Sequence, residues 1–203
     1  MKTESATLRE FEKRIKSISN TFSPLKEIAI RFSNFGIVQD NYEFLIYNQP
    51  EIAPQKYAIY IFNETPQKFF DRFQAENQIE IPSEYEKFLK ELNGCFIFDF
   101  DLFGLTPSIY EKGTLDRTKV QCFDIGSANL HWKREYKNID FNLFHFGGRA
   151  FSDEENIGYF MDLLGNIKSV RKNGEILNEW NNFSTFLKDE IHNAELYENN
   201  KNK

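Results

Sequence analysis

The sequence has little cysteine, no long apolar run and no apolar signal region at its N-terminus. Two cysteines, Cys95 and Cys122, are too few for a disulfide framework. Both lie beside phenylalanine, a setting typical of small buried core residues. No stretch approaches the length of a membrane-spanning helix. We therefore expect a soluble, cytoplasmic protein with reduced thiols and no membrane partner.

Motifs for catalysis and metal binding are also scarce. The three histidines are scattered: His131, His145 and His192. None belongs to a His-Glu-x-x-His motif, and the cysteines do not form a Cys-x-x-Cys pair, so no metal is expected. Gly147-Gly148-Arg149 is too short for a phosphate-binding loop and predicts a turn. The sequence predicts no enzyme and no cofactor, although a dyad of His145 with Cys95 or Cys122 stays open as an alternative.

The sequence has fewer basic than acidic residues: 25 Lys and Arg and 31 Asp and Glu, which gives a net charge of −6. Nucleic-acid-binding proteins usually carry a basic patch, so no nucleic-acid partner is expected. A basic protein partner is favoured instead. What the chain does have is aromatic: 22 phenylalanines predict a well-packed core.

The most informative stretch is 79–105, which predicts a helix, a stop and a strand. Pro82 and a capping box of Ser83 with Glu86 mark the helix start, and Asn93-Gly94 marks its end. From Phe96 the pattern alternates with period two, so a strand is expected over 96–102. Asp99 and Asp101 are expected to share the face of that strand opposite its aromatic side chains.

Other segments alternate between helical and strand patterns. Helices are predicted around residues 8–18, 23–32, 65–73, 127–136 and 183–191. Strands are predicted at 42–48, 56–62, 119–126, 141–146, 156–161 and 166–171. Asp162 to Gly165 predicts a hairpin turn, and Asn173-Gly174 a second turn. The polar tail 194–203 is expected to be frayed. This order favours an α+β fold with a mainly antiparallel sheet packed against N-terminal and C-terminal helices.

The chain resembles the SUKH superfamily, the family of a cell-wall assembly regulator and of many bacterial immunity proteins. The resemblance lies in an ordered set of segments: the Pro-capped helix ending in Asn93-Gly94, 103–105 (FGL), 145–148 (HFGG), 155–160 (ENIGYF), 165–170 (GNIKSV) and 180–187 (WNNFSTFL). It implies a single domain with a curved sheet and a core over 64–193. Residues 1–63 would then be an N-terminal extension of the same domain.

The resemblance implies an immunity protein that binds and neutralises a cognate bacterial toxin, such as a nuclease, without catalysis of its own. A regulatory scaffold that binds an endogenous protein is the alternative. The sequence itself does not separate the two.

Carboxylates and exposed aromatic residues are the candidates for partner contact, since complementary charge steers encounter and aromatic side chains anchor interfaces. The acidic candidates are Asp99, Asp101, Asp153, Glu154, Glu155 and Asp162, and the aromatic candidates are Tyr110 and Tyr159. For the acidic residues, a solvated polar face is an equally good interpretation. For the tyrosines, a place in the core is.

Overall fold

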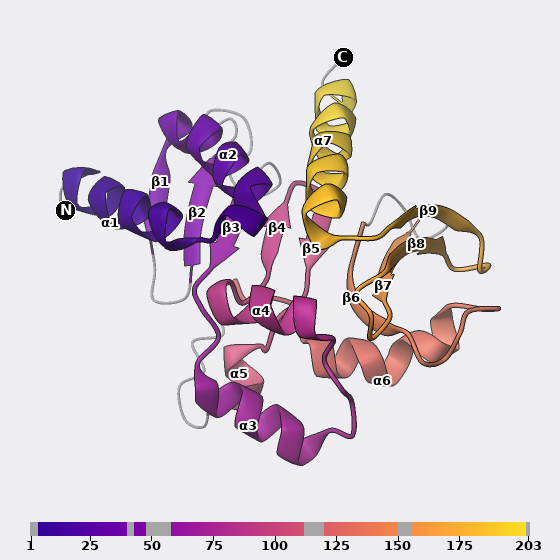
Figure 1. The fold of residues 1–203 in the computed structure, drawn as a ribbon. Coiled ribbons are helices and arrows are strands. Elements are labelled where there is room, and N and C mark those ends of the chain that lie inside the picture. Colours follow the sequence, from indigo (N-terminus) through magenta and orange to yellow (C-terminus); the bar gives the residue numbers. More distant parts are fainter. Residues whose placement is uncertain (1–3, 40–42, 48–57, 112–119, 150–155, 202–203) are drawn as a thin grey trace.

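In the described part of the chain, nine strands form one antiparallel sheet in which each strand pairs with its neighbours in sequence order. The computed structural model describes residues 4–39, 43–47, 58–111, 120–149 and 156–201 (Figure 1). The strands are β1 (Ile37–Gln39), β2 (Glu43–Tyr47), β3 (Ala58–Phe62), β4 (Cys95–Ile97), β5 (Phe100–Leu102), β6 (Phe144–Arg149), β7 (Ile157–Met161), β8 (Ile167–Arg171) and β9 (Ile176–Trp180). The fold is α+β, as the sequence predicts.

Seven α-helices accompany the sheet in the described residues. They are α1 (Glu4–Ser17), α2 (Ser23–Phe32), α3 (Gln67–Glu76), α4 (Ser83–Glu91), α5 (Pro107–Tyr110), α6 (Ile125–Glu135) and α7 (Phe183–Lys201). Short 3-10 turns at Asn20–Phe22 and Ser33–Phe35 flank α2. Figure 1 shows α1, α2, α4 and α7 together on the near side of the curved sheet, with α6 at the lower right beside β6.

The inner face of the sheet, which these four helices cover, carries one large core. Alternate strand residues such as Ile59, Ile97, Phe100 and Phe146 point into it and are buried. The helices contribute aromatic rings, so that the rings of Phe88 and Phe183, for example, lie 5.4 Å apart. Because β1–β3 and α1–α2 pack against this core, the described part of the N-terminal region shares one sheet and one core with the segments that follow it.

The outer face carries two smaller apolar clusters. The first contains Tyr60, Phe62 and Cys122, with Phe96 packed against it. The second lies under α6 and contains Trp132, Tyr136, Phe160 and Val170. A strand places alternate side chains on opposite faces. Each of these strands therefore contributes side chains both to the inner core and to an outer cluster.

The helix α4 and its stop form close to where the sequence predicts, by different contacts. Pro82 is the residue before the helix, and its carbonyl accepts the N–H groups of Tyr85 and Glu86. No side-chain cap is made there, so the predicted capping box is wrong. After the helix, buried Asn93 accepts the N–H of Leu105 at 2.7 Å and donates to its carbonyl at 2.8 Å. Gly94 follows with φ +91°, as the predicted stop requires.

The single strand predicted over 96–102 is wrong, because the segment is a hairpin. The strands β4 and β5 pair with each other, and Phe98 and Asp99 form the turn between them. Phe98 adopts φ +59°, a conformation that non-glycine residues rarely take. The two-residue turn shifts the alternation, so Ile97 and Phe100 both face the inner core, whereas Phe96 and Asp101 face outward.

Three other predictions of local structure are wrong: a turn, a strand and a frayed tail. Gly147 and Gly148 lie inside β6, with a bulge between His145 and Gly147, and do not form a turn. The part of 119–126 that is described makes only an isolated bridge between Asp124 and Gly104 before α6 begins. The tail is helical to Lys201, since α7 continues with Ala194 buried. The strands β1 and β9 are additional to those predicted.

The late hairpins are confirmed. The strands β7 and β8 pair in register on either side of residues 162–166. Gly165 takes φ +89° in that turn, and Gly174 takes φ +93° in the turn between β8 and β9. Glycine adopts these values without the steric cost that a Cβ would impose, which is why the two turn signals are legible in the sequence.

Candidate functional site

Asp99 belongs to a buried ion cluster between the sheet and α7. Arg149, at the end of β6, donates from Nε and Nη2 to Asp99 Oδ2 at 3.1 and 2.9 Å. The side chains are 6% and 4% exposed. Such two-pronged contacts between a guanidinium and a carboxylate are strong and orienting. Asp99 is therefore buried inside the fold rather than on the exposed strand face where the sequence predicts it.

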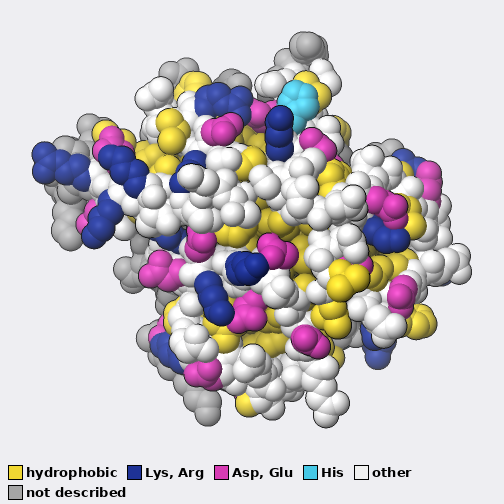
Figure 2. Space-filling view, viewed as in Figure 1, with side chains coloured by type: hydrophobic (Ala, Val, Ile, Leu, Met, Phe, Trp, Pro, Cys, Tyr) yellow, Lys and Arg dark blue, Asp and Glu magenta, His cyan; other side chains and the backbone are white. Residues whose placement is uncertain are grey.

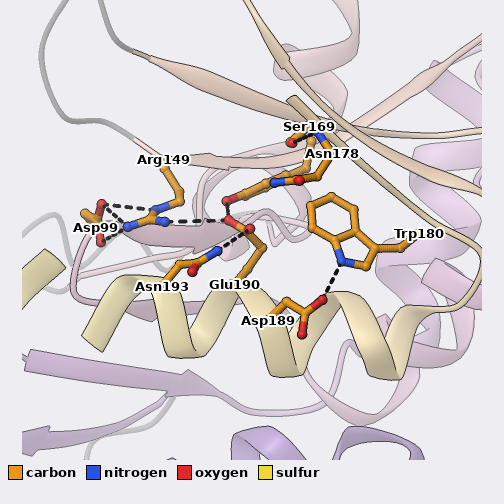
Figure 3. Close-up of polar contacts among 9 residues, drawn as sticks. Asp99, Arg149, Ser169, Asn178, Trp180, Asp189, Glu190 and Asn193 are labelled. Carbon is orange, nitrogen blue, oxygen red and sulfur yellow. Dashed lines mark hydrogen bonds and ion pairs between the residues drawn. The ribbon is translucent and has the colours of Figure 1, made fainter. Parts of the chain in front are cut away.

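The cluster extends to α7 through Glu190 (Figure 3). Arg149 Nη1 lies 3.7 Å from Glu190 Oε2, which also accepts a hydrogen bond from the hydroxyl of Tyr159. Asn193 Nδ2 donates to the other oxygen of Glu190 at 3.0 Å. Figure 3 shows these side chains converging from the β4–β5 turn, β6 and one side of α7. The cluster thus ties α7 to two parts of the sheet.

Asp101 lies only two residues from Asp99 but on the outer face. Its backbone partners are Phe96 on β4 and Gly148 on β6. Among the described residues its carboxylate has neither a hydrogen bond nor a cation. Burial, with a smaller effect from the charge of Asp99, raises the pKa of Asp101 to about 7. Among the predicted acidic contacts that the structure describes, Asp101 is a carboxylate on a face of the sheet with no partner in the described residues.

The remaining acidic candidates divide between a turn and a segment outside the described residues. Asp162 Oδ1 accepts the backbone N–H groups of Leu164 and Asn166, each at 2.9 Å, and so shapes the β7–β8 turn. Slight burial opposes its ionisation, but the hydrogen bonds from Asn166 and Leu164 prevail and lower its pKa. Asp153, Glu154 and Glu155 lie outside the described residues.

Tyr110 and Tyr159 are both core residues, which is the alternative that the sequence left open for them, and not exposed side chains. Tyr159 is fully buried and its ring packs 4.9 Å from that of Phe186. Tyr110 is 5% exposed and packs against Phe69 and Phe73 of α3. In both cases the apolar ring fills space between a helix and its neighbours, which is the commoner fate of such residues.

His145 points outward beneath α6 and is enclosed by aromatic rings. Its ring stacks on Phe160 at 4.6 Å and meets Phe103 edge-on at 5.2 Å. Burial lowers the pKa of His145 to about 4, against smaller effects of the Gly147 and Ala128 backbone. Neither ring nitrogen has a hydrogen-bond partner among the described residues. His145 is therefore not positioned as a base for a thiol.

The two cysteines are buried and free, as the sequence predicts. Cys95 faces the inner core, and its burial raises the pKa of the thiol well above the ordinary range. Cys122 lies in an outer cluster, where burial raises its pKa to about 12. Both thiols are held in the protonated form, which is the unreactive one.

The neighbours of Asp101 on the outer face include Gly148, Gly158 and Tyr136, which the sequence analysis does not identify. Gly148 pairs with Gly158 of β7, so Phe96, Asp101, Gly148 and Gly158 form one row across the outer face. A Cβ added at Gly158 would lie 2.8 Å from both Cζ and the hydroxyl oxygen of Tyr136. Glycine within a strand is a known sign of close approach by another group. This signal was present at both positions and could have been used.

The helical side of the molecule does not present charge of one sign. Figure 2 shows basic and acidic side chains interleaved over α4. Two of its pairs are Lys87 with Glu84 and Lys90 with Glu86, at 2.5 and 2.7 Å. Such exposed pairs neutralise one another and are weak contributors to stability. This face offers no selective attraction for a basic partner.

A groove of about 300 Å³ with a mixed polar and apolar lining lies between α6, the segment 78–80 and the β7–β8 turn. Phe141 and Leu163 line it with 61% and 55% of their surface exposed, and Trp132 contributes from α6. Glu80 and Lys133 are its charged lining residues. With one charge of each sign, the groove does not favour a basic over an acidic partner.

Comparisons with protein-family models, with curated proteins and with solved structures find no match to this chain. In the described residues, no helix combines the length and apolar character needed to cross a membrane. Those same residues contain no cluster of three or more histidine, cysteine or acidic side chains arranged to hold a metal ion.

Proposed function

We propose that this chain is a non-catalytic immunity protein that binds and neutralises a basic toxin domain through the outer face of its sheet. The observation that carries the proposal is Asp101, a half-buried carboxylate on the outer face without a cation among the described residues. Leaving a carboxylate unpaired in such a site costs folding free energy, so a partner that supplies the cation would be favoured. The resemblance to the SUKH superfamily and the net charge of −6 support the same proposal.

The proposed mechanism is occlusion by complementary charge. The acidic chain attracts a basic partner over distance, and the outer face then supplies a desolvated carboxylate for one of the partner's cations. A cation on the toxin that is occupied in this way is withheld from an anionic substrate such as a nucleic acid. No chemical step by this protein is required.

The test begins with tagged wild-type protein and two variants in the native cells. Asp101→Asn removes the outer-face charge, and Glu12→Gln removes one charge from an exposed position on α1 as a matched control. Captured proteins are compared by quantitative mass spectrometry. We expect a basic protein whose recovery falls with Asp101→Asn alone.

That protein is then expressed in a heterologous host with and without this chain. Toxicity that wild type and Glu12→Gln relieve, and that Asp101→Asn fails to relieve, supports the proposal. A captured protein that is not toxic would overturn the immunity role in favour of a regulatory scaffold.

A further inference from the structure

Beside Asp101, at Gly148, the described residues place no side chain on the outer face of the sheet. At Gly148, an added Cβ would meet only the backbone of Ile157, whose carbonyl oxygen is 2.8 Å and carbonyl carbon 3.9 Å away. No side chain of the described residues lies within 4 Å of that point. In the row of paired residues across the outer face, Phe96 and Asp101 carry side chains, but Gly148, the next residue in the row, carries none.

Tyr136 closes the other end of the space over Gly148. Its phenol end lies over Gly158, the partner of Gly148 on the next strand. Asp101 and Gly158 are two strand spacings apart, about 10 Å. The Tyr136 hydroxyl has no hydrogen-bond partner among the described residues. We call the space over Gly148 the Asp101 slot. Asp101 and Phe96 lie on one side of it and Tyr136 on the other.

We propose that the Asp101 slot receives the guanidinium group of an arginine from the protein partner. The inference rests on the proposed function and specifies the chemistry of its central contact. The floor of the slot is the backbone at Gly148, one wall is the carboxylate of Asp101, and Tyr136 offers a hydroxyl opposite. A planar cation fits between two walls of this kind, with its charge against the carboxylate and one edge free for the hydroxyl.

Arginine suits the slot better than lysine for three physical reasons. Its guanidinium donates two parallel hydrogen bonds to a carboxylate. It is more weakly hydrated than an ammonium, so less is lost when it enters a slot beside Phe96. Its planar face also stacks on aromatic rings, which border the slot at Phe96 and Tyr136. A neutral side chain would leave Asp101 unpaired.

The test uses small probes in place of the partner. N-acetyl-arginine amide is titrated into the isotope-labelled full chain at pH 8, where Asp101 is mostly ionised. N-acetyl-lysine amide and N-acetyl-citrulline amide serve as the other cation and as the neutral isostere. We expect saturable chemical-shift changes at the amides of Gly148 and Gly158 with the arginine probe. Lysine should bind more weakly and citrulline should give no saturable change.

Variants locate the probe. Asp101→Asn should weaken arginine binding at least tenfold, whereas Glu12→Gln should leave it unchanged. Gly148→Ala keeps the carboxylate but fills the floor, and should weaken binding likewise. Because its Cβ crowds the Ile157 carbonyl, Gly148→Ala is first checked for a native spectrum. Should it fail to fold, Tyr136→Phe, which removes only the hydroxyl, takes its place with a smaller loss.

Each outcome separates the slot from the function. Equal shifts with citrulline, or no shifts at Gly148 and Gly158, overturn the slot. Tighter binding of lysine than of arginine overturns the guanidinium assignment. Arginine binding without any relief of toxicity leaves the slot standing and removes the immunity role. Relief of toxicity that survives Asp101→Asn keeps the function and removes the slot from the interface.

Discussion

Asp99 on the inner side of the sheet lies against a cation, whereas Asp101 on the outer side has none among the described residues. Asp99 lies against Arg149, and both side chains are less than a tenth exposed. Asp101 is half-buried, yet the described residues supply it with no cation, and its pKa rises to about 7. Asp99 lies in the β4–β5 turn and Asp101 two residues later in β5, with only Phe100 between them.

This difference distinguishes a structural charge from a candidate functional one. A buried charge with its cation and hydrogen bonds present holds parts of the fold in register, and removing one partner leaves the other stranded. A buried charge without a cation lowers the free energy of unfolding, so stability of the fold does not explain its presence. Residues of this kind concentrate at functional sites, where a ligand supplies what is missing. The pair is thus an internal control for the assignment of Asp101.

The sharpest way to break the comparison is to remove the inner cation. Arg149→Met leaves Asp99 and Glu190 buried without their positive charge, so we expect a loss of about 3–5 kcal/mol in the free energy of unfolding. Urea unfolding at pH 7 measures it. Arg171→Met, which removes an exposed ion pair with Glu175, is the control and should cost less than about 1 kcal/mol. Equal losses for the two variants would show that the inner cluster is not stabilising.

The opposite sign is expected for the outer carboxylate. The folded state holds the pKa of Asp101 at about 7, above its ordinary 3.8, so ionisation opposes folding as pH rises through this window. Asp101→Asn should therefore raise the free energy of unfolding at pH 8 by up to about 4 kcal/mol, with no gain at pH 4. Chemical unfolding at both pH values measures it. A destabilised variant at pH 8 would mean that Asp101 has a cation in the folded chain.

The two aspartates also show what the sequence could and could not predict. The α+β class, most helices and the β7–β8 hairpin follow from apolar periodicity and from glycine-containing turns, which are local signals. The turn at Phe98 lacks such a signal, because it has no glycine and interrupts an alternating run. One unrecognised turn of two residues was enough to place Asp99 on the wrong face.

Partners that come from distant segments were beyond the reach of sequence patterns. Arg149 and Glu190 meet Asp99 only because β6 and α7 pack beside the β4–β5 turn. By residue type, Tyr159 and Tyr110 fit a surface or a core equally well. Only their tertiary packing shows that both lie in the core. Asp101 lies on the face opposite Phe100 and Leu102, as predicted, but on the same face as Phe96, and its glycine neighbours required the strand register.

His145 provides an outer-face test with the reverse pH dependence. Its pKa falls from 6.5 to about 4 on folding, so its contribution to stability is present above pH 6.5 and lost as pH falls toward 4. His145→Phe should remove about 3 kcal/mol of that acid sensitivity. Unfolding free energies of variant and wild type are compared at each pH, so that the contribution of Asp101 cancels. His192→Gln, at an exposed position of α7, is the control. An unchanged acid sensitivity in His145→Phe would contradict the buried neutral state.

The smallest effect is expected at Asp162, a carboxylate that is neither buried in an ion cluster nor left unpaired. Its oxygens accept hydrogen bonds from Leu164 and Asn166 in the β7–β8 turn. Asp162→Ala should cost about 1 kcal/mol in the free energy of unfolding. Asp162→Asn should cost less, because the amide oxygen still accepts the two backbone N–H groups. Folding lowers the pKa of Asp162, so the cost should shrink as pH falls below 4. Arginine-probe binding should be unchanged in both variants, since the turn lies outside the Asp101 slot. Reduced binding in them would extend the site along β7 and weaken the contrast between Asp101 and the other carboxylates.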